Sequence, residues 1–360
     1  MKKALQVSAA PLLIALLYLG LWPVPIEPVA WQAPPDNGLV DPFAPNDLLQ
    51  VATGIDLGTL EGPEDATLGR DFYIYVTTLD GQIARIRNRR AEQFAFVDGR
   101  PLGIETADDG ALIIANSFLG LQRVDLQGNL STLLGSLDGE TPVYPNNLAI
   151  ADDGKIYFTE ASAKFGADKY RGTYNASLLD IMEHGGHGSV IEFDPASGAA
   201  RILLDGLNYA NGIAISADNS FLVVAETGSY RVIKYWLTGA NAGQTEVLLE
   251  NLPGFPDNIK SGLNGRFWLG LAAPRNALLD ELSDKPWLRK VVQRLPATLR
   301  PQAVASSQVI AFNGTGEILM NLYDPEARFP TLTGVLETNQ SLYLTTLFGH
   351  ELPVIAKRDL

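Results

Sequence analysis

Oxygen-bearing side chains stand at a constant distance from a turn in four separate parts of the chain. Each of these turns leads into an apolar strand, as in "DGKIYFT" and "NGRFWLG". Seven residues earlier, in "GPEDAT", "YPNNLAI", "YANGIAI" and "FPDNIKS", the chain has Glu64, Asn146, Asn211 and Asp257. Two carboxylates and two amide carbonyls form the hard, all-oxygen set that calcium prefers, whereas zinc favours His or Cys. The spacing therefore predicts one calcium ion.

With four protein ligands, calcium keeps positions for water and substrate, and it can polarise a carbonyl or phosphoryl oxygen. Asp257 is a candidate general base or nucleophile, while Glu64 holds the metal beside it. Asn258 follows Asp257 and either orients these ligands or joins them. Ordinary turn chemistry explains each Asn or Asp separately, but it explains neither Glu64 nor the constant offset.

The elements that must position these residues form a repeat. Six turns of this kind occur, at Asp71, Asp109, Asp153, Asp218, Asn264 and Asn339. The shorter spacings, 38 and 44 residues, match a four-stranded propeller blade. We therefore expect an all-β fold, a six-bladed β-propeller whose innermost strands begin at the offset positions and surround a channel. A β-sandwich is the alternative. The second unit has Leu102 at the offset, and the sixth has Leu332, or Thr333 if the register shifts by one.

The N-terminus predicts a membrane anchor. Two lysines precede the apolar segment 4–22, which is about long enough for a transmembrane helix with the propeller on the extracytoplasmic side. A cleaved signal peptide, giving a secreted or periplasmic protein, is the alternative. The expected organisation is an anchor or signal segment at 1–24, a Pro-rich linker at 25–48 and the propeller at 49–360.

Two long insertions interrupt the repeat, at 160–188 and 273–303, and the second has apolar residues at helical spacing. We expect helical lids over the channel mouth, or, for the second insertion, contact with a membrane surface.

The composition excludes several classes of function. The net charge is −14 without a Lys/Arg stripe, so nucleic-acid binding is disfavoured. The chain has no cysteine, which excludes disulfides, thiolate metal sites and cysteine nucleophiles. No G-x-S-x-G elbow and no P-loop is present.

The combined motifs, among them "GPEDATLG", "NNLAIADDGKIYFTEAS" and "LPGFPDNIKSGLNGRFWLGL", resemble the strictosidine-synthase-like branch of the six-bladed calcium propellers. That superfamily includes gluconolactonase, regucalcin and the paraoxonases, and the likeness is nearest to the adipocyte plasma-membrane-associated type. The resemblance implies a calcium-dependent hydrolase of carboxylic esters or lactones, of the arylesterase or lactonase kind. It maps the metal ligands onto the same four residues, with Asn258 as an extra ligand and a second calcium possible.

The sequence departs from its relatives in ways that leave other functions open. Leu102 and Ser117 stand where paraoxonases have a histidine pair, and Thr333 stands where strictosidine synthase has its catalytic glutamate. The resemblance therefore disfavours a carbon–nitrogen condensing enzyme. A propeller with structural calcium that binds a ligand or partner is the remaining alternative to a hydrolase acting on a small ester or lactone.

Overall fold

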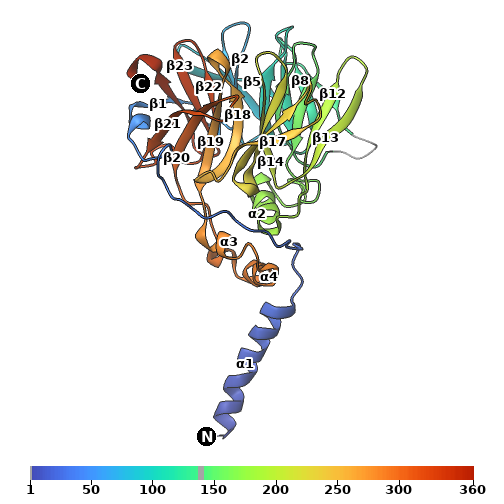
Figure 1. Ribbon diagram of the computed structural model, residues 1–360, viewed down its shortest axis with the longest axis vertical. Helices are drawn as coiled ribbons and strands as arrows, with labels where there is room; N and C mark the ends of the chain where they lie inside the picture. Colours follow the sequence, from blue (N-terminus) through green and yellow to red (C-terminus); the bar gives the residue numbers. More distant parts are fainter. Residues whose placement is uncertain (1, 137–141) are drawn as a thin grey trace.

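The predicted six-bladed propeller is confirmed. The computed structural model describes residues 2–136 and 142–360, and its strands form six four-stranded antiparallel sheets (Figure 1). The innermost strands contact one another in a closed circle, in the order β2, β6, β10, β14, β18, β22 and back to β2. This radial arrangement leaves only short, protected strand edges at the axis and defines a central channel.

In blades 1 to 5 the four strands follow one another along the chain. Blade 1 is β2 (Ala66–Leu68), β3 (Ile74–Thr77), β4 (Gln82–Arg87) and β5 (Arg90–Phe96); blade 2 is β6 (Pro101–Thr106), β7 (Leu112–Asn116), β8 (Gly120–Val124) and β9 (Leu130–Leu134). Blade 3 is β10 (Pro145–Ile150), β11 (Ile156–Glu160), β12 (Gly188–Asp194) and β13 (Ala199–Leu207); blade 4 is β14 (Ala210–Ile215), β15 (Phe221–Glu226), β16 (Arg231–Trp236) and β17 (Thr245–Leu249). Blade 5 is β18 (Gly254–Ser261), β19 (Arg266–Pro274), β20 (Ser307–Asn313) and β21 (Ile318–Asp324).

Blade 6 joins the two ends of the propeller. It consists of β22 (Leu332–Glu337), β23 (Ser341–Thr346), β24 (Glu351–Ala356) and, as its outermost strand, β1 (Thr53–Asp56). In the β1–β24 ladder, Thr53 pairs with Val354 and Asp56 with Glu351. The propeller is therefore closed by backbone hydrogen bonds between its first strand and its last strand.

Five of the six innermost strands carry a β-bulge at the predicted offset position. The register shifts between Pro145 and Leu148 in β10, for example, and between Ala210 and Ile213 in β14; β6, β18 and β22 show the same irregularity. A bulge places an extra residue in the strand and turns consecutive side chains toward the same face. In β22 the shift falls between Leu332 and Gly334, which puts Thr333 at the offset position.

The two insertions form helices at one end of the channel. α2 (Thr173–Glu183) lies in the first, and α3 (Ala277–Glu281) and α4 (Pro286–Arg294) lie in the second. Figure 1 shows these helices together on one face of the propeller.

α1 (Lys2–Leu21) forms where the anchor was predicted and extends away from the propeller (Figure 1). Its end is held to α4, since Arg294 Nη1 donates to the Leu19 carbonyl at 2.9 Å and the Tyr18 hydroxyl donates to the Arg294 carbonyl at 3.1 Å. Within 2–136 and 142–360, no helix is both long enough and apolar enough to cross a membrane.

The segment predicted as a linker lies against the helices. Ile26 is completely buried, and the Val29 amide donates to the Glu183 carbonyl of α2 at 2.9 Å. Trp31 stacks on His184 with ring centroids 4.0 Å apart. We call residues 22–35 the strap, because they tie α1 to α2 and to the second insertion.

The β1 closure predicts a measurable loss of stability when its buried side chain is cut back. Ile55 packs in the core between β24 and blade 1, so Ile55→Ala should lower the free energy of unfolding by about 2–4 kcal/mol in urea titrations. Thr53→Ala, at an exposed position of the same strand, is the control and should change it by less than about 1 kcal/mol. Equal effects of the two substitutions would contradict this account of the closure.

Candidate metal centre

The structure brings the four predicted ligands together. Glu64, which precedes β2, Asn146 in β10, Asn211 in β14 and Asp257 in β18 all line one cavity of about 450 Å³ at the end of the channel. Each of the four side chains is at least nine-tenths buried. Residues that lie up to 193 positions apart in sequence therefore share one pocket floor, which we call the oxygen ring.

The amide oxygens of the ring lack hydrogen-bond donors. Asn146 Oδ1 and Asn211 Oδ1 are buried, and no described group donates to either. The other end of the Asn211 amide is fixed, because Nδ2 donates to Thr227 Oγ1 at 3.2 Å. A buried acceptor without a donor costs about 1–3 kcal/mol, so two of them beside two carboxylates require explanation. A cation that accepts oxygen ligands would satisfy both.

The two ring carboxyls carry raised pKa values. Burial is the main cause for Glu64, where Arg100 opposes the rise and Asp65 adds to it. Burial is also the main cause for Asp257, and the nearby Glu64 charge raises its pKa further while the Asn211 amide lowers it. Two carboxylates in one buried site repel each other, and a divalent cation between them would stabilise both charged forms.

The donor set fits calcium. It contains two carboxylates and two amide oxygens, and waters would complete the 6–8 oxygens that calcium takes. Among the described residues, no group of three or more His, Cys, Asp or Glu side chains is placed to hold a metal ion, so the site differs from the imidazole- or thiolate-rich sites that zinc favours.

Threonines at the ends of second strands hold the ring backbone. Thr159 Oγ1 donates to the Asn211 carbonyl at 2.6 Å, and Thr227 Oγ1 donates to the Pro256 carbonyl at 2.6 Å. Thr77 makes the matching bond to Leu102 at 2.7 Å. Each bond joins one blade to the backbone of the next, at the ring position or at the residue before it, and leaves the ring side chains free to face the cavity.

Asn258 supports the ring from the side that faces away from the cavity, deeper in the channel. Its Oδ1 accepts from Asn147 Nδ2 at 3.0 Å and its Nδ2 donates to the Glu64 carbonyl at 3.0 Å. It is not among the residues that line the cavity. Of its two predicted roles, this arrangement matches orientation of the ligands. Thr333 acts similarly, since its hydroxyl donates to the Glu64 carbonyl at 2.7 Å.

Four residues that stand two positions before a ring position also surround the site, and none of them was predicted from the sequence. Tyr144, Tyr209 and Phe255 line the cavity, and the Tyr144 hydroxyl donates to the Thr173 carbonyl of α2 at 2.8 Å while bonding to the Tyr209 hydroxyl. At the same offset, Arg100 lies buried with Nη2 3.3 Å from Glu64 Oε2. All four residues stand two positions before a ring position, so counting back two further residues in the sequence would have found them.

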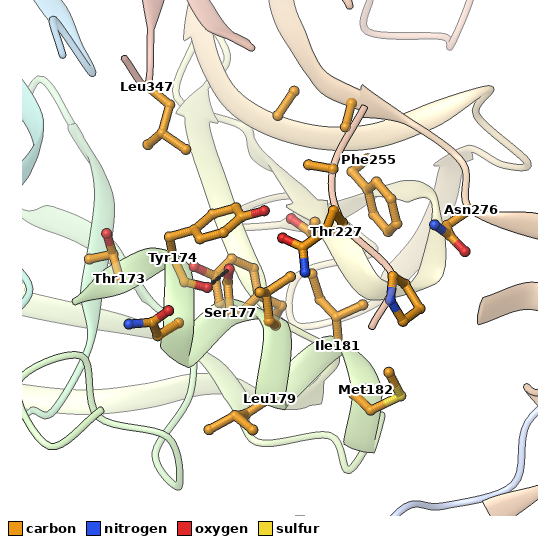
Figure 2. Close-up of a pocket in the computed structure, with 18 of the residues that line it drawn as sticks. Thr173, Tyr174, Ser177, Leu179, Ile181, Met182, Thr227, Phe255, Asn276 and Leu347 are labelled. Atoms are coloured by element: carbon orange, nitrogen blue, oxygen red, sulfur yellow. Dashed lines mark hydrogen bonds between the residues drawn. The ribbon is translucent and has the colours of Figure 1, made fainter. Parts of the chain in front are cut away.

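The insertions and the strap build the outer wall of the cavity. Figure 2 shows Ser177 and Ile181 of α2 on one side and Phe255 of β18 on the other. Arg300 and Val304, which follow α4, and Pro25 of the strap complete the lining. The wall is largely apolar, while the ring supplies most of the polar atoms at the floor. This is the usual composition of a site for small organic ligands.

Comparisons with known proteins place this architecture in a class. Residues 146–240 match the family described as strictosidine synthase, and residues 41–86 match the one described as strictosidine synthase-like, N-terminal. The fold and the oxygen ring therefore define a strictosidine-synthase-like six-bladed propeller.

A narrower assignment follows from full-length relatives. The chain is 32% identical to the adipocyte plasma membrane-associated protein of Bos taurus over 93% of its own length and 84% of the relative's. It belongs to the family of the adipocyte plasma membrane-associated proteins.

Solved structures share the fold at low identity. A gluconolactonase from Xanthomonas campestris matches with a TM-score of 0.63 and 18% identity, over 85% of this chain and 89% of that one. A calcium-binding protein, regucalcin, from Agrobacterium tumefaciens matches with a TM-score of 0.59 and 13% identity, over 85% and 93%.

Substitutions at adjacent asparagines should separate the ring from its support. Asn146→Leu removes an acceptor that has no donor, so the metal-free free energy of unfolding should change by less than about 1 kcal/mol while the rise in Tm on adding calcium is lost. Asn147→Leu leaves Asn258 Oδ1 without its donor and should lower metal-free stability by about 1–3 kcal/mol. Equal metal-free losses in the two variants, measured by urea titration with chelator, would contradict the distinction.

The raised carboxyl pKa values predict how calcium stabilisation depends on pH. The usual values are 4.5 for Glu64 and 3.8 for Asp257, and both are raised in the folded protein. The folded metal-free chain then binds protons more tightly than the unfolded chain. Its stability therefore falls as pH rises from the usual carboxyl pKa values toward the raised values of the folded protein. Calcium needs the ionised carboxylates. The calcium-induced rise in Tm should therefore be small near about pH 5 and grow toward about pH 8, and a rise independent of pH would contradict this.

Proposed function

We propose that this protein is a calcium-dependent hydrolase of small carboxylic esters or lactones. The observation that carries the proposal is the pair of buried amide oxygens, on Asn146 and Asn211, that lack donors beside two carboxylates. The gluconolactonase and regucalcin likenesses support it only through the shared fold.

Glu64, Asn146, Asn211 and Asp257 would hold the calcium. The chemistry that calcium supplies when bound is polarisation of a carbonyl and stabilisation of negative charge on its oxygen. The bonds from the threonine hydroxyls and from Asn258 keep the ring backbone in place, so little reorganisation is needed when charge develops.

Asp257 is the proposed general base. Its carboxylate lines the cavity, where it can accept a proton from a water molecule beside the substrate carbonyl. It takes a proton from the attacking water; the water oxygen bonds to the carbonyl carbon, the ester C–O bond breaks, and the leaving oxygen recovers the proton. The apolar wall, including Ile181 and Phe255, binds the substrate body and limits access of bulk water.

Thr333 does not support a condensing enzyme of the strictosidine synthase type. Its hydroxyl is engaged with the Glu64 carbonyl and with Thr345 Oγ1 at 2.9 Å, and it has no acidic group to offer a substrate amine.

Attachment to a membrane and an extracytoplasmic location remain predictions of the N-terminal sequence. The proposed hydrolysis does not depend on either.

The proposal predicts that hydrolysis requires both calcium and Asp257. The full chain should hydrolyse phenyl acetate or members of a lactone panel, lose this activity in chelator and regain it with calcium. Asp257→Asn should lower kcat/KM at least about 100-fold, because it removes the base. Asp324→Asn, at a buried aspartate that ends β21 of the same blade, is the matched control and should keep most of the activity.

Activity that survives chelation or the Asp257→Asn substitution would overturn the mechanism. A calcium-induced rise in Tm without hydrolysis of any substrate in the panel would instead indicate a binding propeller with structural calcium.

A further inference from the structure

A buried lysine occupies the channel below the oxygen ring. Lys260 lies three residues after Asp257 in β18 and its side chain is 5% exposed. Its Nζ lies 2.9 Å from Asp65 Oδ2, 2.7 Å from the Ile104 carbonyl oxygen and 2.7 Å from Glu105 Oε1. The three ammonium protons thus meet three oxygens from blades 1 and 2.

This oxygen group would otherwise suit a cation. It contains two carboxylates and one backbone carbonyl, and Asp65 is almost fully buried. Asp65 is also held in position, since its Oδ2 accepts from the Ile104 amide at 2.9 Å and its Oδ1 accepts from the Ala66 amide at 2.9 Å. A positioned buried carboxylate next to a carbonyl oxygen is stabilised in its charged form by a nearby positive charge, and calcium commonly supplies one at such sites.

The residues that directly follow the ring positions form a second layer in the channel, and their types alternate from blade to blade. The residue after the ring position is polar in blades 1, 3 and 5 and glycine in blades 2, 4 and 6: Asp65, Gly103, Asn147, Gly212, Asn258 and Gly334. A Cβ on Gly212 would lie 2.1 Å from the Ile259 amide nitrogen, and one on Gly103 would lie 2.7 Å from the Asn147 Cα. Polar side chains thus alternate with glycines where the inner strands approach most closely.

We propose that the Lys260 ammonium is a built-in cation that takes the place of a second divalent ion in the channel. A calcium ion bound to Asp65 Oδ2 and the Ile104 carbonyl would lie about 2.3–2.6 Å from each oxygen. Lys260 Nζ already occupies that position, at 2.9 Å and 2.7 Å from the same two oxygens. The protein therefore binds at most one calcium ion in the channel, at the oxygen ring, and loss of the ammonium opens a second site for a divalent cation.

Counting calcium ions per chain tests this proposal. By isothermal titration with calcium alone, confirmed by elemental analysis, the full native chain should bind one ion and Lys260→Met should bind two. Adding Asp65→Asn to Lys260→Met should remove the second ion. Asp65→Asn alone should leave the native count unchanged, because in the native chain Asp65 binds the ammonium and no metal. This near-isosteric variant carries the test if Lys260→Met does not fold.

The outcomes separate this proposal from the hydrolase. A native chain that binds two ions, loss of an ion in Asp65→Asn alone, or equal counts in Lys260→Met and the native chain would overturn it. A native chain that binds none while Lys260→Met binds one would refute the metal site at the oxygen ring and leave the built-in cation standing.

Discussion

The structure depends on closing six inner strands into a circle while five of them are locally irregular. Regular strands would alternate their side chains between the two faces, and only every second residue would reach the axis. The bulges at the ring position turn consecutive residues toward the channel instead. One layer of side chains then faces the cavity and the next forms hydrogen bonds underneath. Both the oxygen ring and the support from Asn147 and Asn258 follow from that geometry.

Buried charge is stabilised differently in two successive layers of the channel, the oxygen ring (the upper layer) and the group around Lys260 (the lower layer). In the upper layer, Glu64 and Asp257 have raised pKa values and two amide oxygens lack donors, so the layer is poorly satisfied by the chain itself. In the lower layer, the Lys260 ammonium contacts one oxygen from each of Asp65, Ile104 and Glu105. Burial lowers the pKa of Lys260, but the charges of Asp65 and Glu105 raise it by more. A site that the chain leaves unsatisfied is suited to an exchangeable ligand, whereas a site that the chain satisfies serves the fold.

The sequence predicted the features that repeat. The hairpin turns and the constant offset predicted six blades, and the same offset identified Glu64, Asn146, Asn211 and Asp257 as neighbours. The offset left two candidates in blade 6, Leu332 and Thr333, and the register shift between Leu332 and Gly334 places Thr333 at the ring. Here the repeat was visible but its register was not, because a bulge has no reliable signature in a single sequence.

Features that do not repeat could not be predicted in this way. Lys260 contacts the Ile104 carbonyl 156 residues away, and nothing local to "DNIKS" distinguishes it from a surface lysine. Arg100, Tyr144 and Tyr209 were within reach of the same counting, two positions earlier. The packing of 25–48 was not, because its prolines suggest a spacer until the partners in α2 and the second insertion are known.

The strap changes where this chain can be divided. A boundary at residue 49, which the repeat pattern favours, would keep all six blades and the β1 closure. It would also discard Pro25, which lines the cavity, and Ile26 and Trp31, which cover α2 and His184. Such a fragment would retain the oxygen ring but have an incomplete wall, with apolar surface newly exposed to water. For this protein, the smallest unit that folds and the smallest unit with a whole pocket are different lengths of chain.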